Sequence, residues 1–169
     1  MSLLTARREH SCTRPQWRAI IPHMEERSWG QVRTSSPRLV YERVTCGVRV
    51  RVMPAFLEDQ SDPETGRFLW SYTVTIENGG RQTVQLLSRY WHITDASGRV
   101  QEVRGAGVVG AQPVLEPGQV FEYTSGCPLP TASGAMSGHY QMRWASGEDF
   151  EAEIPGFLLE SPHERRQIH

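Results

Sequence analysis

The sequence predicts an all-β protein, built as an antiparallel β-sandwich of about seven or eight strands. From residue 38 onward, apolar side chains recur at every second position, which is the period of a β-strand with one buried face. The alternating segments are short, and turn signals separate them at intervals of roughly 8–12 residues, as in sandwich folds. No segment repeats its apolar residues with the helical period, so we expect no helix in the core.

Each predicted strand shows this alternation and ends where the chain is expected to turn. In the first, three valines alternate with two arginines and a methionine, and the polar loop 58–66 follows. The second strand stops at 78–80 and the third at 95–98, both rich in residues that favour turns. A glycine-rich loop follows the fourth strand, and a hairpin at 146–148 joins the last two. The predicted strands span residues 48–53, 68–77, 84–94, 99–104, 120–124, 139–144 and 150–154.

The number and spacing of the cysteines indicate which β-sandwich class to expect and which redox compartment suits the protein. Cys12, Cys46 and Cys127 are too few and too scattered for a disulfide framework or a C-x-x-C metal site. The chain also lacks the Cys…Trp…Cys arrangement of a true immunoglobulin domain, so a fibronectin-III-like topology is expected within the immunoglobulin-like class. The spacing suits a reducing compartment, and we expect Cys46 and Cys127 to be small buried apolar side chains.

Charge is distributed unevenly along the chain. Residues 1–37 hold six Arg and three Glu, a net of 6 − 3 = +3, and the remainder holds twelve Arg and sixteen acids, a net of −4. A domain with that negative balance is a poor general binder of nucleic acid, because such affinity comes mainly from cations on phosphates. The chain contains no lysine, which excludes a P-loop and Schiff-base catalysis.

The charge and the pattern divide the chain into three parts. We expect a flexible basic extension at 1–37, a sandwich domain at 38–160 and a C-terminal tail at 161–169. The extension is either a disordered segment or the product of a misplaced start, with Met24 as the alternative start, or else a basic anchoring or targeting arm. No stretch approaches the ~18 apolar residues of a membrane span, and no secretory signal is evident, so a cytoplasmic location and no membrane contact are expected.

Seven segments of the chain match a known pattern: 72–78, 85–94, 105–113, 123–126, 134–142, 154–159 and 168–169. Together they resemble the ApaG domain family over about 120 residues in order. The resemblance implies a fibronectin-III-like sandwich and a link to cobalt resistance and magnesium homeostasis. Relatives within F-box proteins and a polymerase-delta-interacting protein imply a protein-interaction role, and the family offers no established catalytic residue to transfer. Ala106 stands where the family commonly has an acid, which weakens a metal-binding role there.

The loop 105–110 reads G-x-G-x-x-G, the pattern that holds a pyrophosphate in dinucleotide-binding folds. Pro113 and Pro117 leave no room for the helix which that reading requires. Two interpretations remain. In one, the loop amides form a nest for phosphate or pyrophosphate. In the favoured one, the glycines shape a crossover between sheets while Val108 and Val109 fill the core. The anion-binding candidates are Arg89, Arg104, Gly105, Gly107 and Gly110.

No other pattern points to a metal centre or a catalytic site. His92 and His139 could face solvent together, but no histidine pair has ligand spacing, and the terminal pair His163 and His169 is expected to be mobile. Ser125 lacks the G-x-S-x-G elbow of a nucleophile. We therefore predict a non-enzymatic domain without a cofactor that binds an unknown protein partner, as a monomer or a weak homodimer paired through an edge strand. Binding of a small anion is the alternative.

Overall fold

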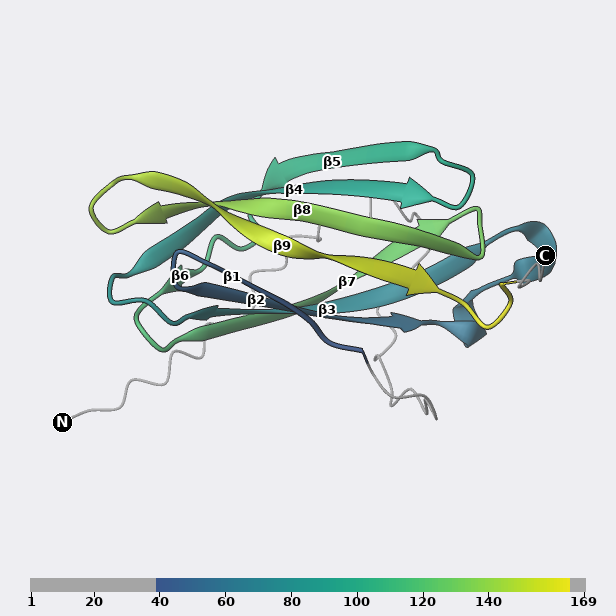
Figure 1. The fold of residues 1–169 in the computed structure, drawn as a ribbon, viewed down its shortest axis with the longest axis horizontal. Helices are drawn as coiled ribbons and strands as arrows, with labels where there is room; N and C mark the ends of the chain where they lie inside the picture. The colour runs from purple at the N-terminus through teal and green to yellow at the C-terminus, as the bar shows by residue number, and fades with distance from the viewer. Residues whose placement is uncertain (1–38, 165–169) are drawn as a thin grey trace.

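The computed structural model describes residues 39–164, which form a β-sandwich of two antiparallel sheets (Figure 1). Sheet I has the strand order β1-β2-β3-β7, and sheet II has the order β5-β4-β8-β9, with β6 also paired to β4. The fold class predicted from the sequence is confirmed. The strands are β1 (Tyr41–Thr45), β2 (Val48–Phe56), β3 (Phe68–Asn78), β4 (Val84–Asp95), β5 (Val100–Ala106), β6 (Val114–Leu115), β7 (Val120–Leu129), β8 (Ser133–Trp144) and β9 (Asp149–Glu160).

The core lies between the sheets and is filled by the side chains that the alternation placed on the inner face. In β2, Val48, Val50 and Val52 are fully buried, while the arginines between them face outward. The largest fully buried side chains include Trp70 from sheet I and Tyr140 and Phe157 from sheet II. Burying a side chain of this kind contributes roughly 1.5–3 kcal/mol, so this layer dominates the stability of the domain.

The two sides of the sandwich differ. On one side β1 lies against β9, where the Glu153 amide donates to Thr45 Oγ1 at 3.2 Å and Arg43 pairs with the Glu153 carboxylate at 2.6 Å. On the other side β5 and β7 are edge strands, and among residues 39–164 each of them is paired along one edge only. The chain crosses between them through residues 107–119, so this open side carries the glycine-rich loop.

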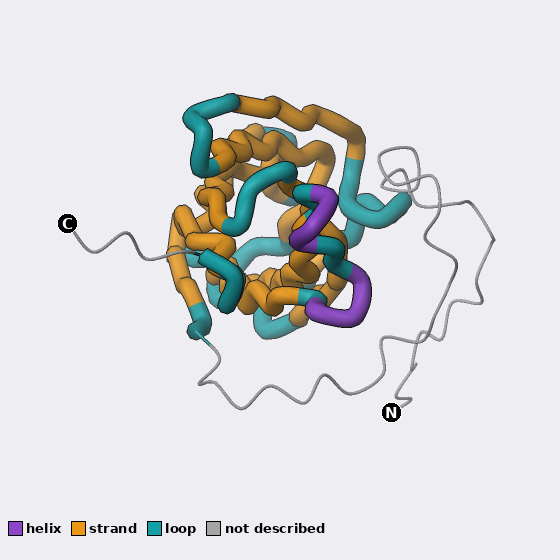
Figure 2. The backbone as a smooth tube through the Cα atoms, turned by 90° about the vertical axis from the view of Figure 1, so that its right-hand side faces the viewer, coloured by secondary structure: helices purple, strands orange, loops and turns teal. Residues whose placement is uncertain are grey.

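Two short 3-10 helices, η2 (Glu58–Gln60) and η3 (Pro63–Thr65), occupy the predicted polar loop at one end of the sandwich, where Figure 2 shows them in purple. His163 reaches this end, with Nε2 2.7 Å from Glu58 Oε1 and its ring beside Phe56. Ser161 is buried and donates its amide to Ala132 O at 3.1 Å. Residues 161–164 therefore pack on the domain, and the expected mobility of His163 is wrong. The remainder of the tail and the extension 1–37 lie outside the described residues.

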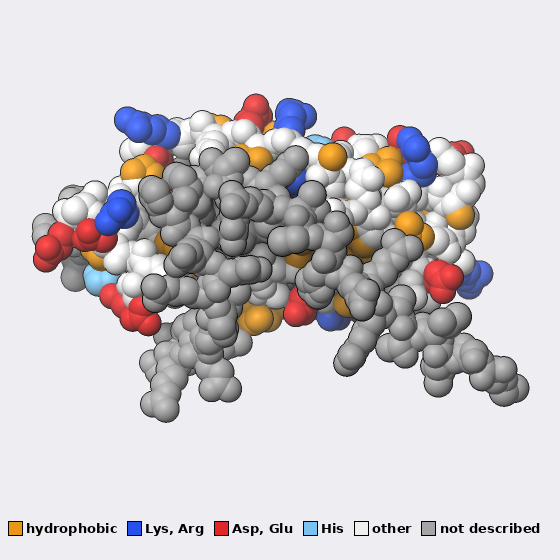
Figure 3. All heavy atoms as spheres, turned by 180° about the vertical axis from the view of Figure 1, so that it is seen from behind, with side chains coloured by type: hydrophobic (Ala, Val, Ile, Leu, Met, Phe, Trp, Pro, Cys, Tyr) orange, Lys and Arg blue, Asp and Glu red, His pale blue; other side chains and the backbone are white. Residues whose placement is uncertain are grey.

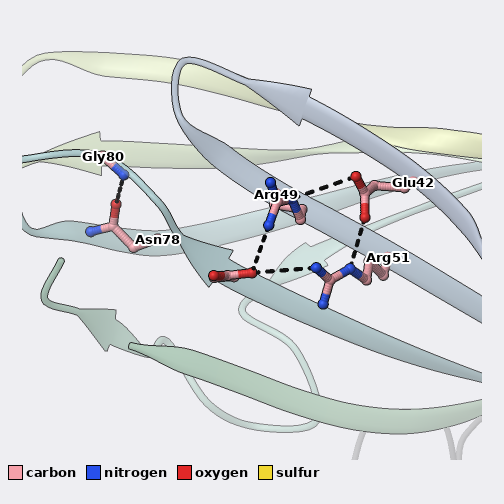
Figure 4. A network of polar contacts seen from close by, with 6 residues as sticks. Glu42, Arg49, Arg51, Asn78 and Gly80 are labelled. Carbon is pink, nitrogen blue, oxygen red and sulfur yellow. Dashed lines mark hydrogen bonds and ion pairs between the residues drawn. The ribbon is translucent and has the colours of Figure 1, made fainter. Parts of the chain in front are cut away.

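The outer face of sheet I carries a network of ion pairs across β1, β2 and β3 (Figure 4). Glu42 accepts from Arg51 at 2.8 Å, and Glu77 accepts from Arg49 at 3.3 Å. Such exposed pairs contribute little, typically below ~1 kcal/mol. On the side seen in Figure 3, the acidic and basic side chains of the described residues are interspersed rather than gathered by sign.

Asn78, at the end of β3, is the one asparagine of the chain and is fully buried. Its side-chain amide donates to Gln82 O at 2.8 Å and to Leu115 O at 2.9 Å, and its Oδ1 accepts from the Gly80 amide at 3.0 Å. Figure 4 shows this last contact. One side chain therefore fixes the crossover from β3 to β4 and the position of β6.

The structure corrects several details of the prediction. β1 and β6 are additional strands, and β7 continues to Leu129 instead of stopping at residue 124. Cys127 is buried as expected, and burial raises the pKa of its thiol to about 12. The expectation for Cys46 is wrong, because it is exposed in the β1–β2 turn with φ at 49°. A turn between two strands projects its side chains into solvent, whatever their polarity.

Candidate functional site

The glycine-rich loop bulges from the edge of sheet II between β5 and β6. The Gly107 amide donates to Leu87 O at 2.8 Å, and Val108 and Ala111 exchange two backbone hydrogen bonds of 2.8 Å. Between them, Val109 and Gly110 have φ of 44° and 78°, as in a two-residue turn of type I′. Val108 is fully buried, so the loop does fill the core in part, as the favoured interpretation predicted.

One of the loop's glycines is required by a close contact with backbone, and a second lies against the side chain of Arg89. At Gly107, where φ is 60°, a Cβ would lie 2.3 Å from Ala111 O. At Gly105 a Cβ would lie 3.0 Å from Arg89 Nη1, so this glycine leaves room for the guanidinium. The amides of Gly107, Val108 and Ala111 are bonded within the protein. A nest made of free amides is therefore not what these residues form, and binding of phosphate at the loop stays a prediction.

The two arginines chosen from the sequence lie on opposite faces of sheet II. Arg89 pairs with Gly105 in the register of β4 and β5, and Arg104 pairs with the next residue, Tyr90. Because successive residues of a strand point to opposite faces, Arg89 and Arg104 cannot share a site. Arg104 lies over the Tyr90 ring on the outer face, 4.3 Å from its centroid. The structure thus separates Arg104 from the predicted group.

Arg89 instead points between the sheets. A bulge between Leu86 and Ser88 adds one residue to β4, so that Arg89 falls in line with the buried Trp91 and Ile93. Arg89 Nη1 donates to Gly107 O at 2.8 Å and to Ala106 O at 3.2 Å. The guanidinium is half-buried and lies at the end of a small internal cavity.

Three tyrosines surround this cation from both sheets. The hydroxyls of Tyr123 and Tyr140 are hydrogen-bonded to each other, and Tyr72 lies across from Arg89 near Ser125. Burial raises the pKa of Tyr72 to about 12, and it raises the pKa values of Tyr123 and Tyr140 as well. The charge of Arg89 acts in the opposite direction on all three. Simple alternation along β4 could not have found this cluster, because the bulge reverses which residues face inward.

A second feature is a hollow of about 280 Å³ on the outer face of sheet II. It forms where the register of β8 and β9 shifts between Met136 and Gly138, which places Pro155 and Gly156 opposite Ser137. A bulge spreads the strands locally, and small side chains at this point leave the face open. The hollow is lined by His92, Thr94, Ala135, Met136, Ser137, Gly156, Phe157 and Leu158.

The histidines considered as metal ligands take other roles in the structure. His139 lies 5.0 Å from the Tyr90 ring and 3.5 Å from Glu151, and His92 borders the hollow on the same outer face. Within residues 39–164, no three side chains of His, Cys, Asp or Glu lie together in a way that could hold a metal ion. In the same part of the chain, no helix is long and apolar enough to cross a membrane.

Comparison with known proteins agrees with this fold. The ApaG domain matches residues 58–144 of the chain. Protein ApaG of Maricaulis maris is 58% identical over 130 residues, which are 77% of this chain and 100% of that protein. Protein ApaG of Brucella canis is 57% identical over the same number of residues.

Two crystal structures extend the comparison to three dimensions. The ApaA protein from Bordetella pertussis is 50% identical, with a TM-score of 0.67 over 69% of this chain and 95% of that one. A second solved structure is 46% identical, with a TM-score of 0.66 over 73% of this chain and 93% of that one. The match in sequence, in length and in fold is consistent, and the chain belongs to the ApaG family.

Proposed function

We propose that this domain is a non-catalytic protein-interaction module, and that a protein partner docks on the outer face of sheet II. The observation that carries the proposal is the hollow at the β8–β9 bulge. Met136 and Phe157 border it with their backbone while their side chains fill the core, and the apolar side chain of Leu158 stands beside it with 51% of its surface exposed. An exposed large apolar side chain beside a depression is typical of an interaction surface.

The dimensions of the hollow favour a protein partner over a free small molecule. Its volume of about 280 Å³ lies at the lower limit for small-molecule sites, and it is an open depression rather than an enclosed cleft. Such a depression suits one anchoring side chain of a partner, the arrangement found at the centre of many interfaces. His92, Thr94 and Ser137 provide a polar border that can form hydrogen bonds around that anchor.

The family's link to cobalt resistance and magnesium homeostasis fits this proposal if the effect on these ions is indirect. The domain would act on ion balance through the protein that it binds, with no metal ion held by the domain itself. The same surface would let relatives use the domain as an interaction unit within larger proteins.

A pair of matched variants tests the docking surface. Leu158→Glu places a charge beside the hollow, and Val120→Glu places one on β7 of sheet I at a side chain that is 54% exposed, close to the 51% of Leu158. Tagged wild type and both variants are used to recover partners from cell extract. We expect a specific protein with the wild type and with Val120→Glu, and at least a tenfold loss with Leu158→Glu.

The proposal fails if all three proteins recover the same set, or if no specific protein is recovered by any of them. A parallel assay covers the enzymatic alternative. Incubation with diadenosine polyphosphates and added Co²⁺ or Mg²⁺ should give no turnover, and product formation that scales with protein concentration would contradict a non-catalytic role.

A further inference from the structure

The interior of the sandwich contains a cavity of about 20 Å³ behind the turn at Val109 and Gly110. It is separate from the hollow, because it lies between the two sheets and opens toward the β5–β7 side. A volume of this size holds a single particle as large as a water molecule. The cavity is lined by Tyr72, Arg89, Trp91, Val109, Gly110, Tyr123 and Ser125.

Arg89 brings an uncompensated positive charge to this cavity. Its only hydrogen bonds within residues 39–164 go to the carbonyls of Ala106 and Gly107, and no carboxylate of that range lies within ion-pair distance. A cation that points between two sheets is costly unless a negative group or a full set of hydrogen bonds accompanies it. Carbonyl oxygens supply part of that compensation and no net charge.

Trp91 provides a second, independent sign that an acceptor belongs here. It lines the same cavity, only 2% of its surface is exposed, and its indole Nε1–H has no partner within the described part of the chain. Buried polar groups are nearly always hydrogen-bonded, so each exception needs an explanation. An indole can only donate, and a guanidinium can only donate. Both groups therefore lack a hydrogen-bond acceptor, and the positive charge of Arg89 favours an acceptor that is an anion.

We propose that this cavity binds one monatomic anion of the size of chloride, held by the guanidinium of Arg89 and the indole N–H of Trp91. The hydroxyl of Tyr72, which also lines the cavity and accepts a hydrogen bond from Ser125, completes the donor set. The site shares Arg89 and Gly110 with the anion-binding candidates predicted from the sequence, but it differs in its ligand, because the cavity is too small for phosphate or pyrophosphate. The turn at Val109 and Gly110 forms the rim of the cavity on the β5–β7 side.

The indole N–H of Trp91 serves as the reporter in the experiment. Its resonance in a ¹H–¹⁵N spectrum is assigned by its disappearance in Trp91→Phe. Sodium chloride is titrated against sodium gluconate at constant ionic strength, so that general salt effects cancel. We expect the Trp91 signal to shift and to saturate with chloride in the wild type, and to give no saturable shift with phosphate.

Two arginine variants separate the site from its surroundings. Arg89→Met should weaken the chloride response at least tenfold, whereas Arg104→Met, which removes an arginine from the outer face of the same sheet, should leave it unchanged. If Arg89→Met does not fold, Gly105→Ala crowds the guanidinium instead, because the added Cβ would lie 3.0 Å from Arg89 Nη1 and the side chain would have to shift. The proposal is overturned if the signal does not saturate, if Arg89→Met and Gly105→Ala respond like the wild type, or if phosphate competes equally.

Discussion

Asn78 and Arg89 are polar residues whose side chains both point into the sandwich, but they differ in how completely their polar atoms are hydrogen-bonded. Every polar atom of the Asn78 side chain is hydrogen-bonded to backbone, with distances of 2.8 to 3.0 Å. Arg89 donates to two carbonyls and faces a cavity beside an indole N–H that has no partner in the described residues. All hydrogen bonds of the Asn78 side chain are therefore made within the protein, whereas the Arg89 cavity contains hydrogen-bond donors that have no acceptor in the described residues.

This difference separates a structural role from a binding role. A buried polar group whose bonds are all made adds to stability and fixes local geometry. A buried group whose bonds are only partly made lowers stability, and it persists where something else supplies the missing partner or where function requires it. The comparison predicts that removing Asn78 harms the fold and that removing Arg89 harms binding instead.

The largest effect on stability is expected from Asn78→Ala. The substitution removes three hydrogen bonds and leaves the Leu115 carbonyl and the Gly80 amide without their partner, at a cost of about 4 kcal/mol. Urea unfolding measures the loss. Gln112→Ala is the control, because that exposed side chain makes a single bond, to Leu87 O at 2.7 Å, and should cost less than ~1 kcal/mol. Equal losses in the two variants would contradict the structural role of Asn78.

The titration of Tyr72 at alkaline pH should have the next largest single effect, and it acts on the Arg89 region rather than on Asn78. Tyr72 has a pKa of about 12 in the folded protein against 10.0 for the free side chain, so folding favours its protonated form. Its contribution is therefore complete below pH 10 and is lost as the pH rises from 10 to 12, by about 3 kcal/mol for two pKa units. Tyr123 and Tyr140 act in the same direction.

Urea midpoints measured between pH 9 and pH 12 check this expectation. The buried thiol of Cys127, whose pKa is also about 12, contributes to the same decline from pH 9 upward. The comparison with Tyr72→Phe isolates the tyrosine, since the variant should lose less stability over the interval than the wild type. Identical declines would show that Tyr72 does not titrate differently in the folded and unfolded states.

The difference between the two regions also explains what the sequence could reveal. Alternation alone predicts the sandwich, most strand positions and the inward side of β2 and β3, because a period of two is a local property. It fails at Arg89, where one extra residue in β4 reverses the inward side, and at the hollow, where a register shift between β8 and β9 opens the sheet. A bulge depends on how two strands that are distant in sequence pair, so the sequence of one segment alone does not predict it.

The glycine-rich loop also shows what a sequence pattern alone cannot predict. Its sequence matches a phosphate-binding pattern, yet Gly105 lies against the Arg89 side chain, and Gly107 is required because the chain turns tightly against Ala111. Arg89 and Arg104 are both candidates for charge partners of the loop, but strand pairing puts Arg104 on the other face of the sheet. A sequence motif specifies residue types, but the pairing register of the strands determines which of those side chains lie close together.

Arg89→Met should have the smallest effect on stability and thereby gives the sharpest test of the comparison. Methionine keeps the length and apolar volume. It removes two hydrogen bonds to carbonyls, and it also removes a charge that no carboxylate of the described residues neutralises. These two effects oppose each other, so in chloride-free buffer the free energy of unfolding should change by less than ~1 kcal/mol. If the cavity binds chloride, the wild type alone gains stability as chloride is added, because the ligand binds only the folded state. The two unfolding curves should therefore separate with chloride concentration. A loss above ~3 kcal/mol in chloride-free buffer would instead place Arg89 beside Asn78 as a structural residue.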